Sequence, residues 1–186
     1  MNLVVVLTGA TGVYAAKVLI EKSPWPVTLV VSDQGKYVYE QECGPIDELI
    51  AAASEIWNDH DLTAPIASGS IPTIGMVILP CTVNTLGKIA NGIGDTLITR
   101  AAHCHLKENR KLILCIRETP WTLITVQNAN KVAAAGGIIM PYSPPFYMMA
   151  NRNLSEVTMV ELINVYVDRV LSLLGHSPEK TWEDIR

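Results

Sequence analysis

Residues Met1–Lys22, MNLVVVLTGATGVYAAKVLIEK, decide how the rest of the chain is interpreted. Leu3–Leu7 is a short, valine-rich apolar run, which predicts a buried strand. The turn TGATG, Thr8–Gly12, follows at once, and Val13–Lys22 has helical spacing. Glycines at such a turn let the backbone approach a phosphate, and the helix points its positive end at it. The stretch therefore predicts a site for a phosphorylated compound, and a tight turn without a ligand is the alternative.

Short apolar runs alternate with helical patterns along the whole chain. The other expected strands are Val27–Val31, Met76–Leu79, Leu112–Ile116 and Gly137–Met140. The expected helices are Lys36–Gln41, Ile46–Ser54, one from Thr82 or Asn84, one capped by Asp95, Thr122–Ala134, and one capped by Ser155 and ending at Leu174, with an irregular stretch at Asn58–Ser70. This alternation predicts an α/β fold, a three-layer Rossmann-like (flavodoxin-like) parallel sheet with helices on both faces. We expect one domain over residues 1–175 and a C-terminal tail over residues 176–186.

The composition excludes several classes of protein. With a net charge of −4, the chain has no basic footprint for nucleic acid. Its apolar runs are shorter than the roughly 20 residues of a membrane span, so no membrane association is expected. At 49% hydrophobic and 17% charged residues the chain is apolar, which favours a homo-oligomer whose subunits cover one another. Four cysteines without paired spacing favour the cytoplasm.

Ligands of parallel α/β sheets bind beyond the carboxyl ends of the strands, where this chain concentrates its polar residues. Pro80–Thr85 is a second strand-to-helix turn, and its hydroxyl and amide groups suit an anion, although ordinary capping by Thr82 is the alternative. Asp33 lies 21 residues after Gly12, near the place of a ribose-binding acid in dinucleotide folds. Cys81 is either a nucleophile or, as we favour, a small buried thiol.

Cationic residues outside the two turns have a structural and a functional interpretation. Arg100, His103 and Lys107 share one helix face, which is either solvated or, if it meets the sheet edge or a neighbouring protomer, phosphate-binding. His103 and His105 point apart on a helix, so no metal site is expected.

Four further residues are candidates for chemistry at the strand ends. Arg117 and Glu118, directly after a strand, form either a structural ion pair or an anion clamp with a proton-transfer group. Tyr147 in a proline-rich loop either packs there or offers a phenol to a ligand, and Arg169 in the last helix is either solvated or a phosphate ligand.

These residues together resemble the UbiX-type flavin prenyltransferases, a family that includes the small proteins of aromatic-acid decarboxylase systems. The resemblance runs from about Leu3 to Leu174 and is carried, in order, by TGATG, SGSIPTIGMVILPCTVNTL, DTLITRAAHCHLKE, LILCIRETP, PPFY and INVYVDRVL. It implies an enzyme that joins a dimethylallyl group from dimethylallyl monophosphate to N5 and C6 of reduced FMN. The prenylated FMN is delivered to a UbiD-type decarboxylase, no metal is needed, and the members are typically dodecamers with sites at subunit interfaces.

The resemblance also implies a role for each matching residue. Glu118 and Glu42 would be the catalytic acids, and Arg100, Lys107, Tyr147 and Arg169 would bind the prenyl phosphate. FMN would be held by Gly9, Ala10, Thr11, Ser32, Thr82, Val83, Asn84, Thr85 and Arg117. Fixed cationic donors of this kind stabilise the charge that grows on a leaving phosphate.

The chain departs from the family pattern at several positions. Thr11 stands where serine is usual, and Asn84 where a basic residue is common. Ile71-Pro72 replaces an aromatic residue followed by a polar one, and isoleucine lacks the π face that holds a cation. Met148-Met149-Ala150 replaces a basic, proline-containing stretch.

Three other functions compete with prenyl transfer. PCTVNTLGKIANGIGDTL resembles the P-x-S-x-N-T motif of flavin-dependent cysteine decarboxylases, for which His60 is the candidate catalytic histidine. A flavin carrier that serves a decarboxylase without catalysis is the second alternative. An NAD-dependent dehydrogenase, resting on Gly9, Gly12 and Asp33, is the third.

Overall fold

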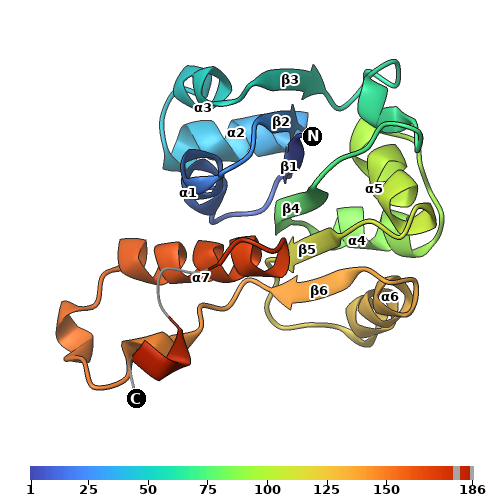
Figure 1. Ribbon diagram of the computed structural model, residues 1–186. Coiled ribbons are helices and arrows are strands. Elements are labelled where there is room, and N and C mark those ends of the chain that lie inside the picture. The colour runs from blue at the N-terminus through green and yellow to red at the C-terminus, as the bar shows by residue number, and fades with distance from the viewer. Residues whose placement is uncertain (178–180, 185–186) are drawn as a thin grey trace.

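The computed structural model describes residues 1–177 and 181–184. Six parallel strands form one sheet in the order β3-β2-β1-β4-β5-β6 (Figure 1). Their bounds are β1 Leu3–Leu7, β2 Val27–Val31, β3 Glu55–Asn58, β4 Gly75–Cys81, β5 Leu112–Ile116 and β6 Ile138–Pro141. The strand order reverses between β1 and β4, which is the point where open α/β sheets bind their ligands.

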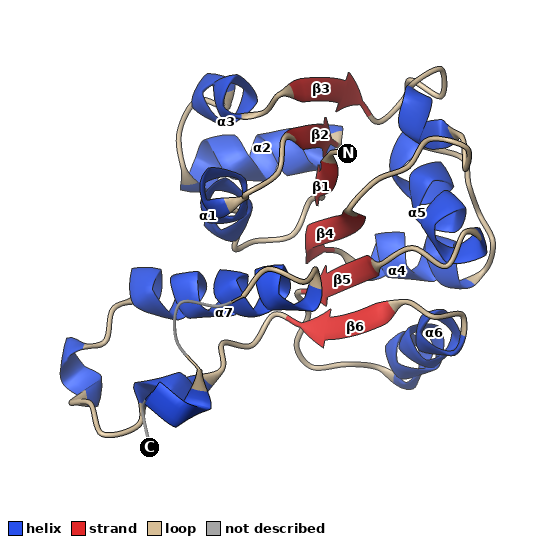
Figure 2. Cartoon of the chain, in the orientation of Figure 1, coloured by secondary structure: helices blue, strands red, loops and turns tan. Residues whose placement is uncertain are grey.

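Helices cover both faces of the sheet (Figure 2). α1, α2, α3 and α7 pack on one face, and α4, α5 and α6 pack on the other. Their bounds are α1 Tyr14–Lys22, α2 Asp33–Glu42, α3 Asp47–Ala52, α4 Val83–Ala90, α5 Leu97–Lys107, α6 Leu123–Ala134 and α7 Met159–Leu173, with 3₁₀ turns at Pro65–Ala67, Phe146–Met149, Leu154–Glu156 and Trp182–Asp184. The predicted three-layer α/β fold is confirmed.

The central strands are apolar throughout because both of their faces are buried. In β1, Val5 belongs to the core under α1 and α7, whereas Val4 and Val6 belong to the core under α4 and α5. None of these side chains is exposed to solvent. This double burial explains why the strand is a continuous hydrophobic run in the sequence and does not alternate.

The edge strand β3 was not predicted. The sequence predicts a helix that ends at Ser54 and an irregular stretch that begins at Asn58. β3 has only four residues, pairs with β2 alone, and alternates half-buried with exposed side chains. A short, polar edge strand has little hydrophobic periodicity, so its sequence gives only a weak signal for a strand. Without β3, the remaining five strands have the flavodoxin-like order.

Two predicted helix caps are also wrong. Thr96 caps α5 in a reciprocal pair with Thr99, and Asp95 instead forms an ion pair with Lys88 at 2.8 Å. Thr158 caps α7 in the same way with Glu161, three residues beyond the predicted Ser155. The threonines lie at the position from which a hydroxyl reaches the third amide of the helix.

The C-terminal end of the chain is described only in part. Gly175, with φ +99°, follows the last turn of α7. Residues 178–180 and 185–186 of the expected tail lie outside the described residues. Within the described part of the chain, no helix is long and apolar enough to cross a membrane.

Buried His105 on α5 makes the stability depend on pH. Its Nδ1 lies 2.8 Å from the Ala101 carbonyl, which only accepts, so Nδ1 carries the proton and Nε2 accepts from the Thr73 hydroxyl. Burial lowers the pKa of His105 below its ordinary 6.5. Below about pH 6.5, His105 therefore binds a proton in the unfolded chain but stays neutral in the folded chain. The stability of the fold decreases as the pH falls toward the pKa of folded His105.

We expect the melting temperature to fall between about pH 7.5 and about pH 5, and the His105→Gln variant to lose part of this dependence. His60 has the opposite sign, because its hydrogen bond with Asp33 raises its pKa. The comparison is therefore made in a His60→Asn background, by thermal unfolding across pH. An unchanged slope in the His105→Gln variant would contradict this origin of the pH dependence.

Candidate functional site

A cavity of about 270 Å³ lies beyond the carboxyl ends of β1, β2 and β4. The first turns of α2, α4 and α5 surround it, and all three helices begin with a hydroxyl cap: Ser32, Thr82 and Thr96. Its lining is Thr8, Gly9, Ser32, Gln34, Asp59, Thr82, Asn84, Thr85, Lys88, Thr96, Ile98 and Thr99. Helix N-termini and hydroxyl groups around a small polar space are suited to an anion such as a phosphate.

Thr8 joins the two predicted turns and was not among the predicted site residues. Its buried hydroxyl donates to the Pro80 carbonyl at 2.7 Å and accepts from the Thr82 amide at 3.1 Å. The β1 turn and the β4 turn are therefore fixed to each other where the strand order reverses. The only sequence signal was that Thr8 begins the TGATG turn.

We expect Thr8→Val to weaken both folding and binding at this cavity. Valine has the shape of threonine but leaves the buried Pro80 carbonyl and the partly buried Thr82 amide without this partner, at a cost of up to about 1–3 kcal/mol for the buried group. Urea unfolding measures the loss of stability, and calorimetry with inorganic phosphate measures the affinity of the cavity for an anion. Thr8→Ser retains the hydroxyl and is the matched control. Equal stability of the valine and serine variants would contradict the bridging role.

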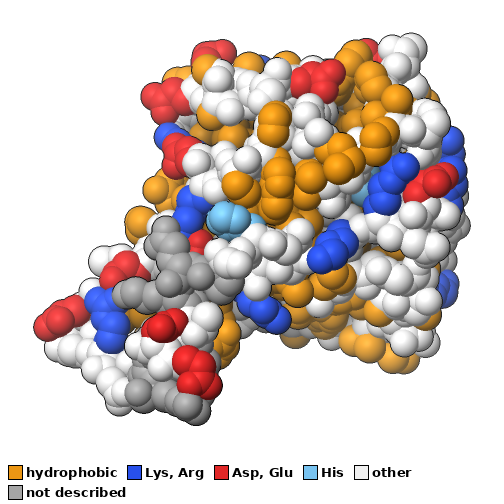
Figure 3. Space-filling view, in the orientation of Figure 1, with side chains coloured by type: hydrophobic (Ala, Val, Ile, Leu, Met, Phe, Trp, Pro, Cys, Tyr) orange, Lys and Arg blue, Asp and Glu red, His pale blue; other side chains and the backbone are white. Residues whose placement is uncertain are grey.

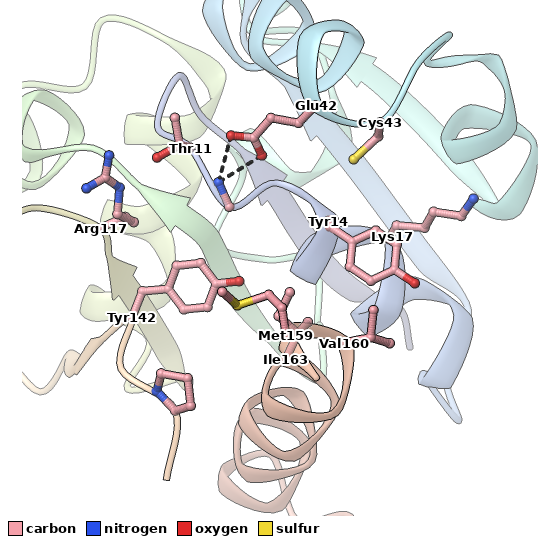
Figure 4. A pocket seen from close by; sticks show the side chains of 12 residues that line it. Thr11, Tyr14, Lys17, Glu42, Cys43, Arg117, Tyr142, Met159, Val160 and Ile163 are labelled. Atoms are coloured by element: carbon pink, nitrogen blue, oxygen red, sulfur yellow. Dashed lines mark hydrogen bonds between the residues drawn. The ribbon is translucent and has the colours of Figure 1, made fainter. Parts of the chain in front are cut away.

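A larger cavity of about 710 Å³ lies on the other side of the TGATG turn (Figure 4). It is enclosed by the start of α1, the end of α2, the first turns of α7 and the chain after β5 and β6. Its lining is Thr11, Gly12, Tyr14, Lys17, Glu42, Cys43, Arg117, Tyr142, Pro144, Met159, Val160 and Ile163. Most of these side chains are apolar, so the cavity suits a flat or hydrophobic ligand with few charges.

Glu42 changes the interpretation of the TGATG turn. Its carboxylate accepts hydrogen bonds from the Gly12 amide at 2.9 Å and the Val13 amide at 3.1 Å. The positive end of α1 is therefore occupied by a carboxylate of the protein itself. The prediction that this helix end would bind a phosphate is wrong for the structure, which offers the α2, α4 and α5 ends instead. The acid lies 30 residues from the turn, so the local motif did not indicate it.

Arg117 and Glu118 follow β5 and do not form an ion pair with each other. Arg117 lines the larger cavity, and its Nε is buried without a hydrogen-bond partner among the described residues. Glu118 accepts from the Thr119 amide at 3.0 Å, while its backbone carbonyl accepts from Trp121 Nε1 at 2.9 Å. A buried donor without an acceptor is costly, so Arg117 is a candidate for contact with a ligand.

Tyr147 and Arg169 do not line the larger cavity. Tyr147 belongs to the 3₁₀ turn Phe146–Met149 and is 51% exposed. Arg169 is exposed on α7, with Nη1 3.4 Å from Ser172 Oγ. The first turns of α7 line the cavity through Met159, Val160 and Ile163, whereas Arg169 lies further along the helix, about 1.7 turns beyond Ile163.

Arg100 and Lys107 lie on α5, on the opposite face of the sheet from α1 and α7. Arg100 donates to the Ala67 carbonyl at 2.9 Å, and Lys107 forms an ion pair with Glu108. Arg110, which the sequence did not single out, holds the loop before β4 through the Gly69 and Ile71 carbonyls. Figure 3 shows Lys and Arg side chains on this side of the molecule. A single copy of the chain does not bring this cationic surface to its own larger cavity.

The residues behind the alternative functions have other partners. His60 Nε2 lies 3.1 Å from Asp33 Oδ2, both side chains are largely exposed, and neither residue lines the two cavities. Cys81 is completely buried, and burial raises the pKa of its thiol, which confirms the interpretation as a structural thiol. His105 uses both ring nitrogens within the fold.

Comparisons with known proteins identify the family. The family model described as "Flavoprotein" matches residues 1–172. The flavin prenyltransferase UbiX of Thermoplasma acidophilum is 38% identical over 177 residues, which are 94% of this chain and 95% of that protein. The chain belongs to the UbiX family of flavoproteins.

Solved structures of UbiX proteins have the same fold. AnUbiX (PadA1), in complex with FMN and dimethylallyl pyrophosphate, matches with a TM-score of 0.87 and 34% identity, over 100% of this chain and 95% of that one. The dodecameric FMN-dependent UbiX-like decarboxylase from Escherichia coli O157:H7 matches with a TM-score of 0.88 and 33% identity, over 97% and 98% of the two chains. The predicted resemblance to UbiX is therefore confirmed over nearly the whole chain.

Proposed function

We propose that the chain is a flavin prenyltransferase, which transfers a dimethylallyl group from dimethylallyl monophosphate to N5 and C6 of reduced FMN. The observation that supports this most is the pair of cavities on either side of the TGATG turn. One is small, polar and surrounded by three helix ends, and the other is large and mostly apolar. An elongated ligand with a phosphate at one end and a flat ring system at the other fits this division.

The predicted FMN residues are divided between the two cavities in the same way. Ser32, Thr82, Asn84 and Thr85 line the small one and would hold the phosphate, with Val83 supplying the first residue of α4. Ser32 Oγ accepts from the Gly35 amide, which leaves its proton for a phosphate oxygen. Gly9, Ala10 and Thr11 would lie along the ligand, and Arg117 Nε would donate to it in the larger cavity.

When bound, reduced FMN supplies the nucleophilic N5 and C6. Glu118, beside Arg117 and open to solvent, would move protons during ring closure. Glu42 would be the second acidic group, and its contact with the Gly12 amide would keep the turn in shape. Tyr147, Arg169, Arg100 and Lys107 would bind the prenyl phosphate and stabilise the charge that develops on it as it leaves.

The separation of Arg100 and Lys107 from the larger cavity supports a site shared between the protomers of a homo-oligomer, which we propose to be a dodecamer. Exposed apolar side chains are available for such contacts. They lie on α6, on the segment leading to α7 and on the first turn of α7: Leu123, Ile124, Val126, Phe146, Leu154, Met159 and Val160. Exposed apolar groups of this extent are typical of surfaces that other protomers cover.

Mixed oligomers test the shared site. Lys107→Ala and Glu118→Gln are each expected to lower prenyl transfer strongly, and their co-expression is expected to restore a measurable part of it. The reason is that a cavity from one variant then meets the intact cationic surface of the other. Arg117→Met with Glu118→Gln is the control, because both changes lie in adjacent residues after β5, on the same side of the proposed shared site, so neither variant supplies an intact copy of that side. Equal activity of the two mixtures would contradict sharing.

We further propose that residues 1–175 are one flavin-binding domain, that the product serves a UbiD-type decarboxylase, and that the protein is cytoplasmic. The four free cysteines fit a reducing compartment.

The deciding experiment is anaerobic incubation of the protein with reduced FMN and dimethylallyl monophosphate, followed by mass spectrometry of the flavin. A flavin heavier by one five-carbon unit is the expected result. Unmodified FMN, also with the diphosphate donor, would favour the carrier instead. Cysteine-peptide decarboxylation that depends on His60 would favour the decarboxylase, and binding of NAD in preference to FMN would favour the dehydrogenase.

A further inference from the structure

Lys88 is the one cation among the described residues that line the small cavity. It lies on α4 four residues after Asn84, so the two side chains share one face of the helix. Its Nζ lies 2.8 Å from Asp95 Oδ2. Asp95 Oδ1 in turn lies 3.5 Å from the hydroxyl of Thr99, which also lines the cavity. These contacts place the ammonium group at the wall of the cavity, between α4 and the first turn of α5.

The ion pair with Asp95 leaves the ammonium group able to bind another anion. An ammonium group has three protons, and the two Asp95 oxygens, at 3.1 and 2.8 Å, accept two of them. The pair is more open to solvent at Asp95, whose side chain is 52% exposed, than at Lys88, whose side chain is 29% exposed. The hydrogen bond from Lys88 lowers the pKa of the Asp95 carboxyl, so this carboxylate is charged at neutral pH and keeps Lys88 in place.

The rest of the lining does not balance the charge of a phosphate. Each helix end around the cavity supplies roughly half a positive charge, so the three ends together supply about 1.5. Asp59, the one carboxylate among the described lining residues, is buried and accepts from the Ile98 amide at 2.8 Å, so it offsets part of this charge. A phosphate monoester carries about −1.5 to −2 at pH 7. Without Lys88, most of the phosphate charge would therefore be unbalanced.

We propose that Lys88 binds the phosphate of FMN and makes the site select FMN over riboflavin, the same flavin without the phosphate. This role rests on the proposed placement of the FMN phosphate in the small cavity. A lysine is a compact charge on a flexible stem, which lets it reach a phosphate while Asp95 still contacts it. Because the side chain of Lys88 is partly buried, its attraction for an anion is screened less than that of an exposed lysine.

Substitutions at position 88 test the charge. Calorimetry measures the affinities for oxidised FMN and for riboflavin. Lys88→Met is expected to lower the FMN affinity by roughly 5- to 30-fold and to leave the riboflavin affinity unchanged. Lys88→Arg retains the charge and should retain most of the preference. Lys36→Met is the matched control, because it removes the same charge from an exposed site on α2 that lines neither cavity.

Asp95→Asn distinguishes phosphate binding from a purely structural ion pair. It breaks the same ion pair as Lys88→Met but leaves the ammonium group, so the preference for FMN over riboflavin should not fall. Added salt gives a second readout. It should weaken FMN binding to the unaltered protein and to the Asp95→Asn variant, and weaken it less in the Lys88→Met variant, because salt screens the lost interaction.

Phosphorus-31 NMR of bound FMN reports the contact directly. A nearby ammonium group favours the doubly charged phosphate, so the bound phosphate should lose its second proton at a lower pH in the unaltered protein than in Lys88→Met. Asp59 and Asp95 are close to the same space and are present in both proteins. Lys88→Gln takes the place of the methionine variant if the latter does not fold.

Equal preference for FMN over riboflavin in the unaltered protein and in the Lys88 variants without charge would overturn this role. So would an Asp95→Asn variant that loses the preference to the same extent, because the ion pair would then be the cause. A protein that selects FMN through Lys88 but makes no prenylated flavin is a different outcome. It would overturn the proposed prenyl transfer and support the role of Lys88.

Discussion

Glu118→Gln is expected to lower prenyl transfer roughly 10²- to 10⁴-fold, the range in which general acid–base groups contribute, while FMN still binds. Glutamine has nearly the same shape and retains an oxygen for the Thr119 amide, which donates to Glu118 at 3.0 Å. It does not exchange a proton at neutral pH, so proton transfer during ring closure stops. Single-turnover assays with mass spectrometry measure the rate and should detect any flavin on which only the first bond has formed.

The control for this prediction is Glu40→Gln. Glu40 is exposed on α2, near Lys36 at 3.9 Å, and lines neither cavity. It should retain full activity. A Glu118→Gln variant as fast as the unaltered protein would remove this residue from the mechanism and leave Glu42 as the remaining proposed acid.

Gly35→Ala is expected to have the largest effect on stability. A Cβ on Gly35, in the first turn of α2, would lie 2.4 Å from the carbonyl oxygen of Leu7 in β1. Backbone on both sides cannot move aside cheaply, so we expect a loss of about 1–3 kcal/mol or more. For a chain of this length, that corresponds to a melting temperature lower by roughly 3–10 °C, measured by thermal unfolding. FMN binding should weaken too, since Ser32 caps the same turn.

The same substitution at Gly87 is the matched control. Gly87 lies in α4, where an added Cβ would meet only Asn128 Nδ2 at 3.6 Å, an ordinary contact. Alanine is the better helix former by about 0.8–1 kcal/mol, so Gly87→Ala should raise the melting temperature. The two Gly→Ala substitutions, both in helices, would then change the melting temperature in opposite directions. Equal destabilisation by both would show that crowding against β1 is not the cause.

Local patterns predicted most of the fold. β1, β2 and β5 were bounded correctly because their short apolar runs end at glycine or polar residues. The edge strand β3 was missed because four alternating residues, two of them exposed, produce no comparable signal. The caps at Thr96 and Thr158 were missed because a neighbouring Asp or Ser is an equally good cap by type, and only the path of the backbone distinguishes them.

The candidate site was predicted less completely, because its contacts join residues that are distant in the sequence. The strand-end rule found Thr11, Thr82 and Arg117, and it would also have indicated Tyr142, which directly follows β6. It could not show that Glu42 neutralises α1. The placement of Lys107 on the other face of the sheet likewise depends on how α5 packs, which no short motif encodes.

The carboxylate of Glu42 on the Gly12 and Val13 amides affects how the site empties. Because the Glu42 carboxylate accepts from the Gly12 and Val13 amides, the TGATG turn has a counter-ion of its own and is held in shape without a ligand. A flavin would then be held by its phosphate at three helix ends and not at a fourth. The proposed transfer of the product to a decarboxylase would require its release at the end of every cycle. The internal carboxylate therefore limits the grip on the flavin, which favours fast release over tight storage.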